Sequence, residues 1–80
     1  MYTFSLYPRI AVDPEICEGK PHILGTRLTI SAILAYLAGG MKIEEFSEAF
    51  PQVKKEDVFQ ALGFASGLLQ DQIIPLSKTA

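Results

Sequence analysis

The side chains that could carry chemistry in this sequence are few, and Cys17 and His22 are the most suggestive pair. They flank a short segment that contains Gly19 and Pro21, so a turn there can bring the thiol and the imidazole together. A Cys–His pair can form a nucleophile, but it normally needs a third group that orients the base and a cleft around it. As metal ligands, the two residues supply only half of the usual zinc set. A zinc site would therefore have to be shared between two chains.

Other signatures of catalysis are equally weak. Glu44, Glu45 and Glu48 lie close together, but on a helix they are more typical of a solvated face than of an acid–base pair. The glycine spacing of a phosphate-binding loop or a dinucleotide fold is not present. We therefore expect no catalytic residue, no metal and no cofactor, and a protein that binds rather than an enzyme.

Length and charge limit what such a protein can bind. A chain of 80 residues forms one domain with a thin core, which favours a partner. The net charge is −2 and the pI about 5.2, whereas a free-standing nucleic-acid-binding domain usually has a basic surface. Charge therefore ranks a protein partner above DNA.

The single cysteine and the hydropathy indicate the compartment. Cys17 cannot form a disulfide within the chain, and a lone cysteine fits a reducing compartment, either as a small buried side chain or as an exposed redox thiol. No secretory signal is visible, and no uncharged stretch reaches the roughly 18 apolar residues of a membrane helix. We expect a cytoplasmic protein that does not contact a membrane.

Two short strands are expected before the helices. Apolar residues alternate with polar ones from Tyr2 to Leu6, the period of a half-buried strand, and Pro8 should end it. Because no neighbour is obvious in the same chain, the segment 1–8 is expected to pair with another chain; the alternative is a frayed terminus. A second strand is expected at Arg9–Val12, pairing briefly with Ile23 and Leu24.

Three helices should follow. The first carries apolar residues at helical spacing from Ile30 to Leu37, is capped by Thr29 or Ser31, and ends at Gly39 and Gly40. The others are expected at 43–50 and 54–69. The inner face of the last is predicted to be Val58, Leu62, Ala65 and Leu69. The predicted fold is mainly α: a three-helix, helix-turn-helix-like domain over residues 9–70, preceded by short N-terminal β-strands and followed by a tail at 71–80.

The last helix and the tail hold more apolar residues than one core can bury. Gly63 and Gly67 leave one side of this helix unshielded, which indicates either a close contact or ordinary tolerance of glycine. The residues predicted to bind a partner come from this region and from the N-terminal strand: Tyr2, Phe4, Leu6, Phe64, Leu68, Ile73, Ile74 and Leu76.

Residues that could contact DNA form two groups. In a helix-turn-helix, the last helix enters the major groove by its N-terminal residues, which here include Lys54, Lys55 and Gln60. A second, basic group lies around the glycine-containing turns and comprises Arg9, Lys20, His22 and Arg27. Against this interpretation, Glu56 and Asp57 would face the same polyanion.

One motif is distinctive as a whole. The chain reads Gly19-Lys20-Pro21-x-Ile23-x-Gly25-Thr26-Arg27 after Ile10-x-Val12-Asp13-Pro14-Glu15-Ile16-Cys17, and the similarity continues to about residue 69. This run resembles the family catalogued as domain of unknown function 433. The resemblance implies a helix-turn-helix, homeodomain-like fold and a likeness to VapB-type antitoxins, which are encoded beside a PIN-like ribonuclease toxin.

That likeness implies a binding protein of a type II toxin–antitoxin pair that neutralises the PIN-like toxin and binds operator DNA. The alternative is a stand-alone, dimeric DNA-binding transcriptional regulator. Either should work as a homodimer or a higher hetero-oligomer. The motif itself is expected to be structural, with glycine turns stiffened by Pro21 and with Arg27 bonded to a carbonyl or carboxylate; direct contact with a ligand or nucleic acid is the alternative. Lys42 and Lys54 replace the usual Ser or Thr caps, which should weaken each cap by about 1 kcal/mol.

Overall fold

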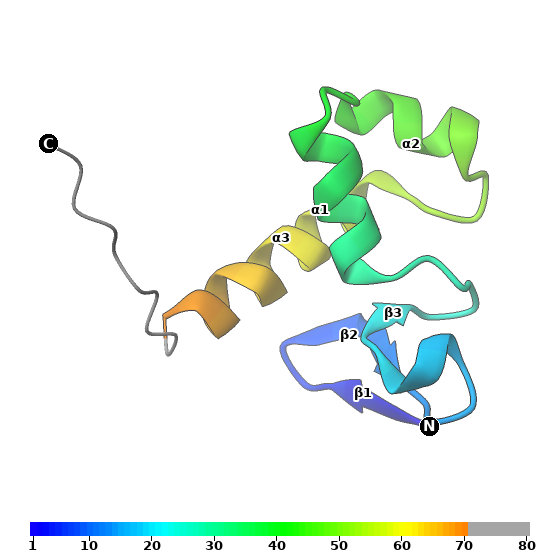
Figure 1. Cartoon of the computed structure of the whole chain (residues 1–80), viewed down its shortest axis with the longest axis vertical. Helices are drawn as coiled ribbons and strands as arrows, with labels where there is room; N and C mark the ends of the chain where they lie inside the picture. The colour runs from blue at the N-terminus through cyan, green and yellow to red at the C-terminus, as the bar shows by residue number, and fades with distance from the viewer. Residues whose placement is uncertain (71–80) are drawn as a thin grey trace, which may run out of the picture.

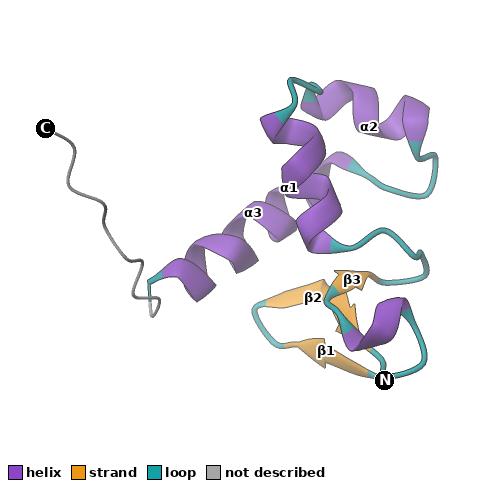
Figure 2. Cartoon of the chain, viewed as in Figure 1, coloured by secondary structure: helices purple, strands orange, loops and turns teal. Residues whose placement is uncertain are grey.

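The computed structural model describes residues 1–70, in which a three-stranded antiparallel sheet precedes three α-helices (Figures 1 and 2). The predicted order of short strands followed by three helices is confirmed, although the sheet and its turns fill the whole chain before the first helix, so the fold is less purely helical than expected. The elements are β1 (Tyr2–Phe4), β2 (Tyr7–Val12), the 3₁₀ turn η1 (Cys17–Gly19), β3 (His22–Ile23), α1 (Ile30–Ala38), α2 (Ile43–Ala49) and α3 (Lys55–Leu69).

The N-terminal strand has a neighbour in its own chain, so that part of the prediction was wrong. β1 pairs antiparallel with β2, with Tyr2 opposite Val12 and Phe4 opposite Tyr7, and the chain reverses between the strands (Figure 2). Pro8 does not end the strand but lies inside β2. It is tolerated because the register of β1 shifts between Thr3 and Phe4, which leaves Pro8 without a partner on β1, and β3 pairs only with Ile10 and Ala11, so the missing N–H is not needed.

The other side of β2 behaves as predicted. Ile23 of β3 lies opposite Ile10, as expected from their apolar pairing, and both side chains are fully buried. They pack on the helices around a single core that includes Ile33 of α1 and Phe46 of α2. The sheet packs through β2 on α3, and α3 in turn contacts α1 and α2.

The helix ends follow the local sequence closely. Thr29 caps α1 by accepting a hydrogen bond from the Ala32 N–H at 3.1 Å, and Gly40 beyond its end adopts φ +103°. Lys42 gives α2 no side-chain cap, and Lys54 gives none to α3. Instead, the Glu45 carboxylate accepts the backbone N–H of Lys42, and the Asp57 carboxylate accepts the backbone N–H of Lys54. These bonds offset part of the stabilisation lost without a side-chain cap.

The buried face of α3 differs from the predicted one. Val58 is buried as expected, but Leu62 and Leu69 are 38% and 58% exposed. The core positions are instead Asp57, Val58, Ala61 and Phe64. The helix is therefore rotated about its axis relative to the expectation. Figure 1 shows that its C-terminal end, in orange, extends past the sheet and α1.

The two glycines of α3 have different surroundings. A Cβ on Gly63 would lie 2.9 Å from Cε1 of Tyr7, so this glycine lets the tyrosine of β2 lie directly on the helix. A Cβ on Gly67 would meet no neighbouring atom within 4 Å. The expected close contact is therefore present at Gly63 and comes from the same chain. None of the helices in residues 1–70 has the length and hydropathy of a membrane span.

The glycine pair makes a direct test of this packing. Replacing Gly67 with alanine should raise the free energy of unfolding by about 1 kcal/mol through helix propensity alone. Gly63→Ala should show no such gain, because the new methyl displaces the Tyr7 ring. Urea unfolding of both variants measures the difference. Equal gains at the two positions would contradict the contact, and a Tyr7→Ala background should restore the gain at position 63.

Candidate functional site

A polar network joins the sheet to the N-terminal half of α3. The guanidinium of Arg9 donates from Nε to Oδ1 of Asp57 at 2.8 Å and from Nη2 to Oδ2 at 3.3 Å, and its backbone N–H donates to Gln60 Oε1 at 2.9 Å. Asp57 is only 1% exposed, and its Oδ2 also accepts the Lys54 N–H at 3.0 Å. Arg9 and Gln60, both predicted to contact DNA, are therefore occupied within the fold.

The ionisation of Asp57 is set by this network. Burial alone would raise the pKa of the carboxyl, but hydrogen bonds from Arg9 and the Lys54 N–H, together with the charges of these two residues, outweigh burial and hold the pKa below its ordinary value. Asp57 therefore stays charged inside the fold. It does not face solvent beside Glu56, so the expectation that it lies on the same exposed face was wrong.

The only histidine is also structural. His22 is 1% exposed, and its Nδ1 lies 3.1 Å from the carbonyl oxygen of Lys20, which can only accept the hydrogen bond. Its predicted place in a basic surface cluster was therefore wrong. The Sγ of Cys17 is half-buried and lies 3.2 Å from the carbonyl oxygen of Arg27. Each member of the suspected Cys–His pair thus bonds to backbone.

Within residues 1–70, no three His, Cys, Asp or Glu side chains lie close enough together to hold a metal ion. Glu44, Glu45 and Glu48 are all exposed on α2. The solvated face expected for these three carboxylates is what the structure has.

The remaining motif residues build the connection from β3 to α1. Gly25 adopts φ +81°, which favours glycine, and Thr26 Oγ1 donates to the Ile23 carbonyl at 2.8 Å while accepting the Leu28 N–H at 3.1 Å. The carbonyl of Pro21 accepts the N–H of Ile30 at the start of α1. The structural role expected for the turns is confirmed.

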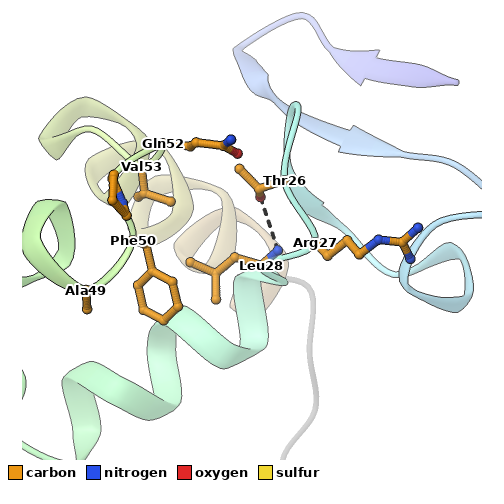
Figure 3. A pocket seen from close by; sticks show the side chains of 8 residues that line it. Thr26, Arg27, Leu28, Ala49, Phe50, Gln52 and Val53 are labelled. Atoms are coloured by element: carbon orange, nitrogen blue, oxygen red, sulfur yellow. Dashed lines mark hydrogen bonds between the residues drawn. The ribbon is translucent and has the colours of Figure 1, made fainter.

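Arg27 is the exception in this motif. Its side chain is exposed and hydrogen-bonds to none of residues 1–70, so the expected bond to a carbonyl or carboxylate is not found there. It borders an apolar pocket of about 480 Å³ between the β3–α1 connection and the α2–α3 turn. Figure 3 shows Leu28, Phe50 and Val53 around this pocket, while Arg27 points away from Phe50.

Four predicted DNA-contacting cations remain on the surface of the described chain. They are Lys20, Arg27, Lys54 and Lys55. The ammonium of Lys55 lies 5.9 Å from the ring centroid of Phe59, on the solvent side of α3.

The predicted partner-binding residues differ widely in their exposure to solvent. Phe64 is only 8% exposed, packed against Phe4 at a centroid separation of 4.7 Å and edge-on to Tyr7, so it is a core residue rather than the exposed side chain that was expected. Leu68, Tyr2 and Leu6 are 53%, 75% and 84% exposed and remain available. Ile73, Ile74 and Leu76 lie outside the described residues.

Leu68 belongs to an apolar groove that sequence reasoning missed. The groove, about 230 Å³ in volume, lies between α1 and α3, and Lys20 contributes its only charge. Leu34, which was expected to face the core, contributes to its wall. The lining residues are Lys20, Pro21, Ile30, Ser31, Leu34, Phe64, Ala65 and Leu68. Only the excess of apolar residues on α3 signalled this groove in advance.

Comparison with known proteins identifies the family. Residues 10–65 match the model of the family described as protein of unknown function (DUF433). The chain belongs to that family. A solved structure of a DUF433 member protein from Anabaena variabilis is similar, with a TM-score of 0.74, 25% identity and coverage of 81% of this chain. This chain spans only 64% of the length of that one. No curated protein matches the sequence.

The Arg9–Asp57 pair predicts a pH dependence of stability. Because the folded-state pKa of Asp57 is lowered, its contribution is complete above the unfolded pKa, near pH 4, and is lost as pH falls through the folded value. Asp57→Asn should therefore be less stable than the parent at pH 7, and the gap should close toward pH 2. Thermal unfolding across this range checks it, and a gap independent of pH would contradict it.

Replacing the other partner should cost more. Arg9→Met leaves the buried Asp57 carboxylate without its counter-ion, which should lower the free energy of unfolding by about 3 kcal/mol at pH 7. Asp57→Asn should cost less, because it removes the buried charge and leaves an oxygen to accept the Lys54 N–H. Urea unfolding at pH 7 ranks the two variants, and the reverse order would refute the role given to Arg9.

Proposed function

We propose that this chain is an antitoxin-like binding protein that holds and neutralises a PIN-like ribonuclease, with the groove between α1 and α3 as its principal contact. The observation that carries the proposal is the groove itself: an open, apolar channel beside the exposed Leu68 on a helix end that extends past the rest of the fold. Exposed apolar surface of this kind is typical of a protein contact.

Charge supports a nuclease as the occupant. A ribonuclease needs a basic surface to attract RNA, whereas this chain has a net charge of −2 and presents Glu44, Glu45 and Glu48 on the outside of α2. An acidic protein is complementary to such a surface and gains in association rate and specificity. The Arg9–Asp57 pair removes one charge of each sign, so the rest of the chain keeps the net charge of −2.

Operator-DNA binding is the second candidate, with α2 and α3 as the helix-turn-helix pair. One observation favours it: Asp57 is buried and paired with Arg9, so it no longer opposes Lys54 and Lys55 at the start of α3. Gln60, however, holds the Arg9 N–H rather than facing outward to read a base. We propose that any DNA contact relies on phosphates and needs a dimer or a toxin-bound complex to assemble enough positive charge.

The groove can be tested with a matched pair of variants. Leu68→Glu places a charge in the groove at an exposed position and should abolish co-purification with the ribonuclease encoded beside the gene and relieve its inhibition. Ala35→Glu adds the same charge to an exposed position of α1 outside the groove and should change neither. Pull-down and RNA-cleavage assays measure both effects. Retention of inhibition by Leu68→Glu would show that the groove is not the contact.

DNA binding has its own test. A mobility-shift assay with the promoter of the gene pair should show a salt-sensitive complex that Lys54→Glu/Lys55→Glu abolishes. The same complex should persist in Gln60→Ala if phosphates rather than bases are contacted. The absence of a shift at low salt, with and without the ribonuclease, would remove this second candidate.

A further inference from the structure

A second exposed apolar surface runs along α3, apart from the groove. Phe59, Leu62 and Leu69 are 51%, 38% and 58% exposed and recur three or seven residues apart, which places them on one face of the helix. Lys55 and Ser66 belong to the same face by spacing, and both are exposed. We call the five residues Lys55, Phe59, Leu62, Ser66 and Leu69 the outer stripe.

The outer stripe is unusual for a helix face in water. From Val58 to Gln70 the chain contains no charged residue at all, whereas the solvent face of an ordinary amphipathic helix is charged or polar. The core explains the apolar residues at Val58, Ala61 and Phe64, which are buried. It does not explain the outer stripe, because none of its residues belongs to the core cluster of residues 1–70.

The two ends of the outer stripe are electrostatically complementary to each other. Lys55 supplies a positive charge in the first turn of α3, where the helix dipole disfavours it, and the last turn contains no basic residue to satisfy the free carbonyl groups there. Leu62 lies midway in sequence between Lys55 and Leu69. A second α3 running antiparallel, with Leu62 near the two-fold axis, brings each Lys55 to the other helix's C-terminal end.

The same arrangement matches side-chain sizes. Over the roughly 21 Å from Lys55 to Leu69, antiparallel pairing about Leu62 places the large Phe59 near the small Ser66 of the second copy. Large side chains then face small ones on both halves, as helix packing at close range requires. A two-fold interface needs such a self-complementary surface, whereas an unrelated partner does not.

We infer that the occupant of the outer stripe is a second copy of this chain, so that the protein forms an antiparallel α3–α3 dimer. Three large side chains per copy form a patch smaller than the roughly 800 Å² per partner of a standard interface. The dimer should therefore dissociate on dilution. Because the groove that we assign to the ribonuclease lies on a different side of α3, dimerisation leaves it free, and the two inferences can fail separately.

The test is sedimentation equilibrium of the full chain over a hundred-fold concentration range. The parent should shift from monomer to dimer, and Leu62→Glu should remain monomeric throughout, with an unchanged circular dichroism spectrum. Ala35→Glu, at an exposed position of α1 outside the outer stripe, is the matched control and should dimerise like the parent. Lys55→Glu should weaken the dimer at least several-fold, and high salt should reduce the difference from the parent.

Two results would overturn the inference: a parent chain that is monomeric at every concentration, or a dimer that survives Leu62→Glu. Ribonuclease binding by the same variants separates this inference from the proposed function. Leu62→Glu should still bind and inhibit the ribonuclease, whereas Leu68→Glu should still dimerise. If Leu62→Glu instead loses ribonuclease binding while the parent is a monomer, the outer stripe belongs to the toxin contact and the dimer is refuted.

Discussion

The structure depends on one ion pair between residues 48 positions apart, Arg9 on β2 and Asp57 on α3. Neither burial nor helix propensity favours a carboxylate in the core. Asp57 is stable there because Arg9 neutralises its charge and the Lys54 N–H completes its hydrogen bonds. Because Asp57 also caps the start of α3, one side chain fixes where the helix begins and which face it turns to the sheet. The backbone contact of Arg9 with Gln60 repeats that restraint one turn later.

Because these polar residues stabilise the fold, they are not available to bind a partner. Arg9, His22 and Gln60 serve the fold, and the motif turns serve the entry to α1, so the surface offers few groups for chemistry and few for reading a base. Apolar surface remains on both exposed sides of α3. In our account one side binds a ribonuclease and the other a second copy. This double use explains why a helix that extends past its own core contains no charge after Asp57.

Local signals in the sequence were sufficient to predict the helices and strands, but not which face of α3 is buried. Apolar spacing and the Thr29 cap predicted α1, and the Ile10–Ile23 pairing followed from short apolar runs. The rotation of α3 was missed because hydrophobic periodicity cannot place a buried aspartate whose partner lies far away in sequence. That error exchanged Phe64 with Leu62 and Leu69 between core and surface. The burial of His22 similarly depends on a backbone carbonyl that no pattern shows.

The most direct measurement of the central claim is a chemical-shift map of the ¹⁵N-labelled chain titrated with the neighbouring ribonuclease. Perturbed amides are expected along the groove, centred on Ser31, Leu34, Ala65 and Leu68, with the Arg9–Asp57 region unchanged. Perturbation confined to the start of α3, from Lys54 to Gln60, or no perturbation by the ribonuclease while promoter DNA produces one, would contradict it.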